Sequence, residues 1–256
     1  DTAVVTLENI IVPSAGSNLP PVTFDGFNGG NLPTISPGWF EIDGVDAPPI
    51  DGTTGFSSWT SAPFGNDAAS PNGTAARLNI FSNFLDREWI AGPKFTVTAQ
   101  SFLFYDLALT DFASTLPGTL GSDDTVMVMM SIDCGGAYFP IAIYDSSSVI
   151  SNTGQTDSID LSSFAGEEAY IAFVGDAGTV IDPEDIDFFL DNINIREVLP
   201  LDMAASAITT PSGDACFTTT EDIVVEVENQ GTQTIDFATD NMTVTVEVAG
   251  PNANTY

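Results

Sequence analysis

The segment Ile186-Asp187-Phe188-Phe189-Leu190-Asp191-Asn192-Ile193-Asn194-Ile195 alternates in polarity along its length. Successive side chains of an extended strand point to opposite sides, so Asp187 and Asp191 share one face with Phe189, and Ile186, Phe188 and Leu190 lie on the other. The apolar face is suited to a core, and the first face carries carboxylates. This pattern indicates a strand in a sheet that packs against a second layer, as in a β-sandwich.

Similar apolar runs recur along the chain between turns rich in Gly, Pro, Asn and Ser, and helical periodicity is nearly absent. The sequence therefore predicts an all-β chain built as a β-sandwich rather than a βαβ fold. The predicted strands are residues 3–7, 75–81, 101–108, 125–132, 138–143, 169–174, 187–195, 223–228 and 242–248. Two long stretches, residues 39–70 and 145–157, are predicted to be rich in loops.

A domain boundary is predicted between Arg196 and Leu201, where one strand pattern ends and another begins. Residues 1–198 are enough for one sandwich. Residues 201–256 alternate cleanly but hold too few strands to close a two-sheet core. We therefore expect a complete first domain, a truncated second domain, and a chain that is the N-terminal part of a longer protein.

The charge of the chain restricts its chemistry. It has no histidine, and only 4 Lys and Arg side chains oppose 36 Asp and Glu, for a net charge of -32. Without imidazole there is no Ser-His-Asp couple and no histidine general base, so we expect no enzymatic activity. Binding to nucleic acid is not expected, because the sequence has no clusters of cationic side chains. Membrane insertion is not expected either, because long apolar segments are missing.

Carboxylate chemistry remains open. The densest acidic run is Asp182-Pro183-Glu184-Asp185-Ile186-Asp187, followed by Asp191. Carboxylates so close together repel one another unless a cation neutralises them, and Ca²⁺ takes about 6 to 8 oxygen ligands of this kind. The alternative is a solvated acidic loop. Asp123-Asp124 and Asp145 have two interpretations, further ion sites or turn caps, of which turn caps are favoured.

Aromatic and sulfur side chains allow two interpretations each. Trp39, Trp59 and Trp89 can pack into the ends of the sandwich. Alternatively, Trp59 presents an aromatic platform to a sugar or protein ligand. Cys134 and Cys216 fall in different predicted domains, where they are isolated thiols or partners of cysteines elsewhere, or else they bridge each other.

Several short motifs occur in an order that resembles a known family. They are Phe24-Asp25-Gly26-Phe27, Pro37-Gly38-Trp39, Arg87-Glu88-Trp89-Ile90-Ala91-Gly92-Pro93, Phe102-Leu103-Phe104-Tyr105, Ile132-Asp133-Cys134-Gly135-Gly136, Asp160-Leu161-Ser162-Ser163-Phe164-Ala165-Gly166 and Phe189-Leu190-Asp191-Asn192-Ile193. Together they resemble the choice-of-anchor J and cleaved-adhesin type of MAM-like jelly-roll domain. The segment from Met203 onward is similar to Ig-like modules of the CARDB type.

This resemblance implies a jelly-roll β-sandwich followed by the start of an Ig-like β-sandwich. It also implies a bacterial, Bacteroidetes, surface or secreted multidomain protein exported by the type IX secretion system. In resembling domains a structural Ca²⁺ lies between an early strand and the final one, which maps to Asp25 and Asp191; Asp43 is a further candidate ligand. Two motifs depart from the family, with Cys134 in the Asp133-to-Gly136 turn and Ile90 after Trp89.

The sequence thus favours a non-catalytic, calcium-stabilised extracellular module of a cell-surface adhesin or similar secreted protein. Its expected partners are a surface glycan, a protein ligand or neighbouring domains of the same long chain. The alternative is a carbohydrate-binding accessory region of a secreted hydrolase or protease. A third hypothesis, a glycosidase, requires two carboxyl groups about 5 to 9 Å apart in a cleft.

Overall fold

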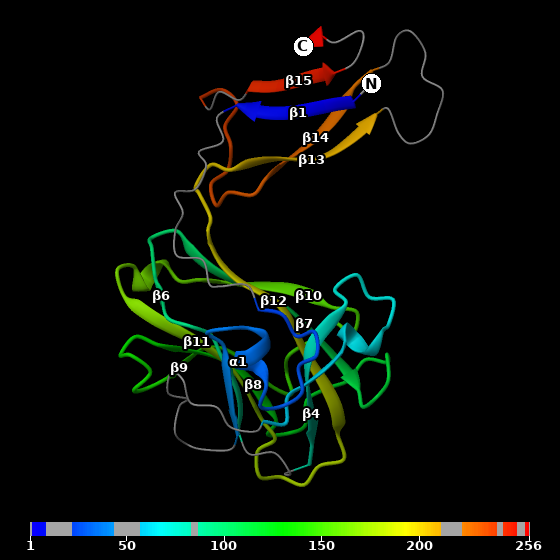
Figure 1. Cartoon of the computed structure of the whole chain (residues 1–256), viewed down its shortest axis with the longest axis vertical. Coiled ribbons are helices and arrows are strands. Elements are labelled where there is room, and N and C mark those ends of the chain that lie inside the picture. Colours follow the sequence, from blue (N-terminus) through cyan, green and yellow to red (C-terminus); the bar gives the residue numbers. More distant parts are fainter. Residues whose placement is uncertain are drawn as a thin grey trace. The chain divides into compact units, whose positions relative to one another are not determined.

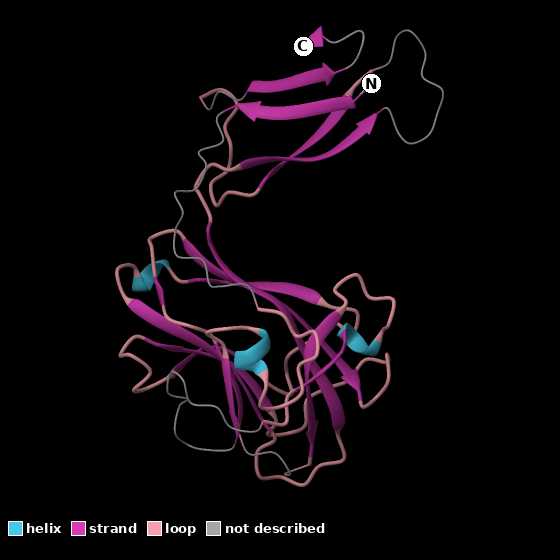
Figure 2. Ribbon diagram, viewed as in Figure 1, coloured by secondary structure: helices cyan, strands magenta, loops and turns pink. Residues whose placement is uncertain are grey.

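A computed structural model describes residues 2–8, 22–43, 57–82, 87–210, 222–239, 243–249 and 254–255 of the chain. The chain divides into two compact units. The larger unit is Gly16–Arg196, and the smaller unit combines Asp1–Ala15 with Glu197–Tyr256. Strands dominate both units (Figure 1, Figure 2). No helix in the described part of the chain is long and apolar enough to cross a membrane.

The described residues of the larger unit form two antiparallel sheets. Sheet 1 has the strand order β10 (Gln155–Asp160), β7 (Ser101–Asp111), β12 (Asp185–Glu197), β4 (Thr74–Phe81) and β3 (Thr60–Pro63). Sheet 2 has the order β2 (Phe40–Asp43), β5 (Glu88–Ala91), β11 (Glu168–Asp176), β8 (Thr125–Ser131) and β9 (Phe139–Tyr144), and β6 (Phe95–Thr96) also pairs with β11. The described connections include the short helices α1 (Leu32–Ile35), η1 (Phe64–Asn66) and η2 (Ser162–Phe164).

The hydrophobic core lies between these sheets. The apolar face of β12 is buried, as its alternation predicts, and it packs in one cluster with side chains of β7 and β8. Tyr105 of β7 meets Phe173 of β11 edge to face, with 5.2 Å between ring centroids. Because these two strands belong to different sheets, the contact joins the two layers. The predicted fold class, all-β with a jelly-roll β-sandwich, is confirmed.

Each of the nine predicted strands has a counterpart in the structure, namely β1, β4, β7, β8, β9, β11, β12, β14 and β15. The loop-rich stretches were predicted less well, because β2 and β3 lie within residues 39–70 and β10 begins within residues 145–157. β2 is only four residues long and includes Glu41, whose polarity hides the strand pattern. Glu41 is fully buried, and the backbone N–H groups of Gly30 and Leu32 offset the cost of its burial by donating to its carboxylate.

The smaller unit has a sheet of β1 (Thr2–Glu8), β15 (Thr243–Ala249) and β16 (Asn254–Thr255), and a pair formed by β13 (Met203–Thr210) and β14 (Val224–Asn229). β1 pairs antiparallel with β15, from Thr2 opposite Ala249 to Glu8 opposite Thr243. This pairing corrects the assignment of residues 1–198 to a single domain. The first strand belongs with the C-terminal segment, and the sandwich lies between the two parts of the smaller unit in sequence.

Candidate functional site

A polar pocket of about 340 Å³ opens on the larger unit. It is lined by Val22, Thr23, Phe24, Asp25, Asn72, Gly73, Thr74, Asp191 and Asn192. These residues come from the segment before α1, the turn that leads into β4, and the middle of β12. We call this cavity the Asp25–Asp191 pocket.

Two of the three predicted metal ligands, Asp25 and Asp191, are therefore brought together by the fold. The third, Asp43, lies at the end of β2 in the other sheet, opposite Glu88 of β5. Burial, together with the charge of Asp43, raises the pKa of Glu88 above its ordinary value. Asp43 is thus separated from the pocket.

Asp191 is the most buried carboxylate of the pocket, with 8% of its surface exposed. Burial, and then the negative charges of Asp106 and Asp25, raise the pKa of Asp191 to about 6. A backbone hydrogen bond from Asn192 acts in the opposite direction. The charged form of Asp191 is thus disfavoured by the protein itself, and a bound cation would reverse that preference.

Asp106 supports the pocket and was missed by sequence reasoning. The side-chain amides of Asn72 and Asn192 donate to its Oδ2, at 2.9 and 2.7 Å, and the hydroxyl of Thr156 donates to Oδ1 at 2.5 Å. Since each amide donates through its nitrogen, its oxygen is the atom left for a cation or a hydroxyl group. Alternation in β7 places Asp106 on the outward face, but its closeness to Asp191 depends on β7 and β12 being neighbours.

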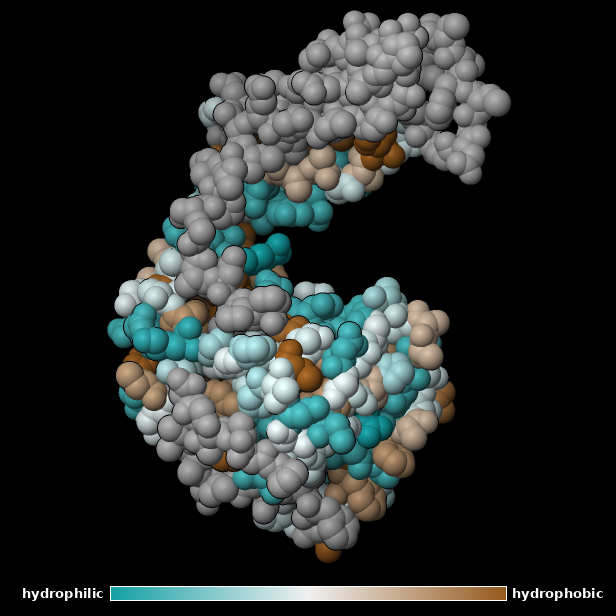
Figure 3. All heavy atoms as spheres, in the orientation of Figure 1, coloured by the Kyte–Doolittle hydropathy of each residue, from teal (hydrophilic) through white to brown (hydrophobic). Residues whose placement is uncertain are grey.

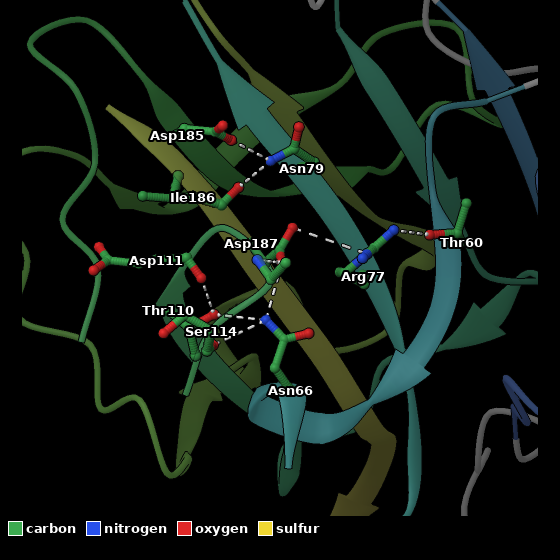
Figure 4. Close-up of polar contacts among 11 residues, drawn as sticks. Thr60, Asn66, Arg77, Asn79, Thr110, Asp111, Ser114, Asp185, Ile186 and Asp187 are labelled. Carbon is green, nitrogen blue, oxygen red and sulfur yellow. Dashed lines mark hydrogen bonds and ion pairs between the residues drawn. The ribbon is translucent and has the colours of Figure 1, made fainter. Parts of the chain in front are cut away.

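Asp187 has a different environment from Asp191, although both lie on the same face of β12. Asp187 is fully buried, and its Oδ2 accepts hydrogen bonds from Asn66 Nδ2 at 2.9 Å and from the backbone N–H of Ala113 at 2.8 Å (Figure 4). Arg77 Nε lies 3.9 Å from its Oδ1. These partners mark Asp187 as a structural group that ties η1 and the loop after β7 to sheet 1.

The predicted turn caps Asp123 and Asp124 do accept backbone hydrogen bonds, but they also meet a third carboxylate. One oxygen atom each from Asp123, Asp124 and Asp182 lies within 4.8 Å of the others. This acidic triad is an arrangement that can hold a metal ion. Both acidic stretches, Asp123-Asp124 and the run that begins at Asp182, are visible in the sequence. Nothing in the sequence predicts that the fold brings them together.

Trp59 is not an exposed platform. Its side chain is fully buried, its ring meets Phe188 edge to face at 6.3 Å, and its Nε1 donates to the backbone oxygen of Glu88 at 3.1 Å. The structure therefore corrects the interpretation of Trp59 as a ligand-binding residue and agrees with the packing alternative. Trp39 and Trp89 are buried as well.

Cys134 is an exposed free thiol in the turn after β8, where it adopts a positive φ of 63°. Cys216 lies outside the described residues.

No protein-family model and no curated protein matches the chain. Several solved structures are similar in fold. The K3 cleaved adhesin domain of Lys-gingipain from Porphyromonas gingivalis is 14% identical, with a TM-score of 0.41, over 71% of this chain and 99% of that domain. The K2 cleaved adhesin domain of Lys-gingipain is 15% identical, with a TM-score of 0.40, over 75% and 99%.

A carbohydrate-binding module, TmCBM61 in complex with β-1,4-galactotriose, is 10% identical to the chain. Its TM-score is 0.35, and the match covers 62% of this chain and 88% of the module.

Proposed function

We propose that the chain is a non-catalytic extracellular binding module in which the Asp25–Asp191 pocket holds a structural Ca²⁺. The observation that carries this proposal is the meeting of Asp25 and Asp191, from the start and the end of the larger unit, in one polar cavity. Asp106 adds a third carboxylate beside them.

The pocket supplies oxygen ligands of the kind that Ca²⁺ prefers. Carboxylates of Asp25 and Asp191, amide oxygens of Asn72 and Asn192, backbone carbonyl groups and waters together match the roughly 6 to 8 ligands of this ion. A cation there would connect the segment before α1 to β12. It would also stabilise the charged form of Asp191, whose pKa is raised first by burial and then by the charges of Asp106 and Asp25.

An extracellular setting fits the charge of the chain. Hydrophilic residues cover much of the visible face of the larger unit, among scattered apolar ones (Figure 3). A net charge of -32 is best tolerated where salt and divalent cations screen it. We assign the chain to the surface or secreted proteins of Bacteroidetes that use type IX secretion, on the motifs that resemble cleaved-adhesin domains. Fractionation of the source cells, with an antibody against this chain, tests that location.

The calcium proposal is tested by thermal unfolding with and without Ca²⁺. After treatment with chelator, added Ca²⁺ should raise the melting temperature, with a stabilisation of about 2.7 kcal/mol at a hundredfold excess over Kd. Asp191→Asn and Asp25→Asn should each reduce this shift. Asp111→Asn, an exposed acid at the end of β7, is the matched control and should keep it. The proposal fails if Asp191→Asn responds to Ca²⁺ as strongly as the unaltered chain.

Carbohydrate binding is the second candidate function, and a surface on sheet 1 favours it. Phe102 and Phe104 of β7 are half-buried and stacked, with centroids 6.2 Å apart, and Arg196 lies 4.2 Å from the Phe104 centroid. The exposed side chains of Ser158 and Asp160 lie opposite them on β10. Aromatic faces beside a few polar groups suit the apolar and hydroxyl sides of a sugar ring.

A glycan array on the unaltered chain and on Phe102→Ala tests this candidate. Binding to a defined glycan that disappears in Phe102→Ala, while the fold is retained, would support the carbohydrate-binding alternative. A blank array for a folded protein would leave protein ligands or neighbouring domains as the partners. Release of reducing ends from any glycan would contradict the non-catalytic assignment.

A further inference from the structure

A second group of carboxylates lies in two loops of the larger unit that are far apart in sequence. Asp123 and Asp124 directly precede β8, and Asp182 lies in the connection between β11 and β12. One oxygen atom from each of these three residues lies within 4.8 Å of the others. None of them lines the Asp25–Asp191 pocket.

One oxygen of each carboxylate is held by backbone donors. The N–H of Gly121 donates to Asp124 Oδ2 at 2.8 Å, and the N–H of Ser122 donates to Asp182 Oδ2 at 2.9 Å. The N–H groups of Thr179 and Val180 donate to Asp123 Oδ2 at 2.7 and 3.0 Å. The backbone therefore fixes the direction in which the second oxygen of each group points.

Those second oxygens have no hydrogen-bond partner among the described residues, although each is a buried atom. They are Oδ1 of Asp123, Oδ1 of Asp124 and Oδ1 of Asp182, and Oε2 of the nearby Glu184 shares this property. Asp124 is fully buried. Burying a carboxylate oxygen without a partner is energetically unfavourable. Several such oxygens in one place therefore indicate a bound cation that they coordinate together.

No cationic side chain of the protein supplies that contact. Each Lys and Arg has a partner elsewhere: Arg77 with Asp187, Arg87 with Asp176, Lys94 with Glu168, and Arg196 with the Phe104 ring. Burial, and then the charges of Asp182, Asp123 and Glu184, raise the pKa of Asp124 to about 6, as expected for acids that lack a counter-charge.

Two glycines allow the carboxylates to approach. A Cβ atom on Gly121 would collide with Asp182 Oδ2, and one on Gly178 would collide with the carboxylate of Asp123. Gly178 also has a positive φ of 63°, which residues with a side chain rarely adopt. Both loops thus bring backbone close to the acids and leave no room for a side chain between them.

We propose that Asp123, Asp124, Asp182 and Glu184 form a Ca²⁺ site that joins the β7–β8 loop to the β11–β12 loop. Four carboxylate oxygens, completed by waters or backbone carbonyls, suit Ca²⁺ better than Mg²⁺, which usually keeps most of its waters and takes one or two carboxylates. This site is independent of the Asp25–Asp191 pocket, because the two share no residue.

Isothermal titration of the chelator-treated protein with CaCl₂ tests the proposal. We expect two Ca²⁺ sites in the unaltered chain and loss of one site, or an affinity at least about tenfold weaker at one site, in Asp124→Asn. Glu184→Gln should weaken the same site. Asp111→Asn should bind as the unaltered chain does, and MgCl₂ should compete poorly.

The variants distinguish the two sites. Loss of Ca²⁺ binding in Asp124→Asn, with binding kept in Asp191→Asn, supports the site of Asp123, Asp124, Asp182 and Glu184. This holds even if the Asp25–Asp191 pocket binds no ion. Binding lost only in Asp191→Asn overturns the present proposal and leaves the pocket standing. Circular dichroism checks that Asp124→Asn is folded; if it is not, Glu184→Gln decides, and unchanged stoichiometry and affinity in that variant overturn the proposal.

Discussion

Asp187 and Asp191 lie on the same face of β12, yet their environments differ completely. Asp187 is surrounded by donors from Asn66 and Ala113 and lies near Arg77. Asp191 has like charges as neighbours, and its pKa is raised to about 6. Residue type and alternation are the same for both. What differs is which loops and strands lie beside them, so one acid accepts hydrogen bonds from its neighbours and the other lines a polar pocket.

Removing the side chain of Asp187 should destabilise the larger unit strongly. Asp187→Ala leaves the side-chain amide of Asn66 and the backbone N–H of Ala113 without an acceptor, and it removes the counter-charge of Arg77. We expect a loss of about 3 kcal/mol in the free energy of unfolding, measured by urea denaturation. Asp111→Ala, at an exposed position, should change it by less than about 0.5 kcal/mol. Equal losses in the two variants would contradict a structural role for Asp187.

At the scale of elements, long strands with clean alternation were predictable and short polar strands were not. β7 buries alternate side chains from Ser101 to Leu107, β12 buries the unbroken run from Ile186 to Asp191, and each of the nine predicted strands is present. β2 and β3 were missed because each has only four residues, and polar residues such as Glu41 and Ser61 leave no alternation of apolar and polar side chains to recognise. These short strands form by pairing with β5 and β4, and such pairing cannot be read from local sequence.

Trp59, which directly precedes β3, should contribute strongly to the stability of the larger unit. Its ring is fully buried against Phe188 of β12, so Trp59→Ala opens a cavity in the core. We expect the free energy of unfolding to fall by about 3 to 5 kcal/mol, with no selective effect on Ca²⁺ affinity in the folded protein. Phe112→Ala is the control, because Phe112 is 49% exposed. A Trp59→Ala protein of unaltered stability would revive the interpretation of Trp59 as a surface platform.

At the scale of the whole molecule, the chain passes from the smaller unit into the sandwich and back. β1 pairs with β15 across nearly the full length of the sequence, so the smaller unit is discontinuous. The strand at residues 2–8 was predicted correctly, but its partner was not. Long-range pairing is invisible to sequence pattern, because alternation says which face is apolar and not which strand lies beside it.

Deleting residues 1–15 should therefore affect the two units differently. The deletion removes the strand that pairs with β15, so the thermal transition of the smaller unit should move to lower temperature or disappear. The transition of the larger unit should stay in place, since its sheets contain no residue of β1. Differential scanning calorimetry measures both. A shift of the larger unit's transition alone would contradict this division of the chain.

The sequence by itself determined the all-β class, most of the strands, the absence of histidine chemistry and the acidic character of the protein, because composition and alternation are local properties. It also indicated Asp25 and Asp191 through a family resemblance. Only the tertiary structure decided that these two acids share a cavity with Asn72 and Asn192 beside Asp106, and that Asp123, Asp124 and Asp182 meet. Both groupings depend on strand order and loop approach. Those are set by packing between residues far apart in sequence, which no local pattern records.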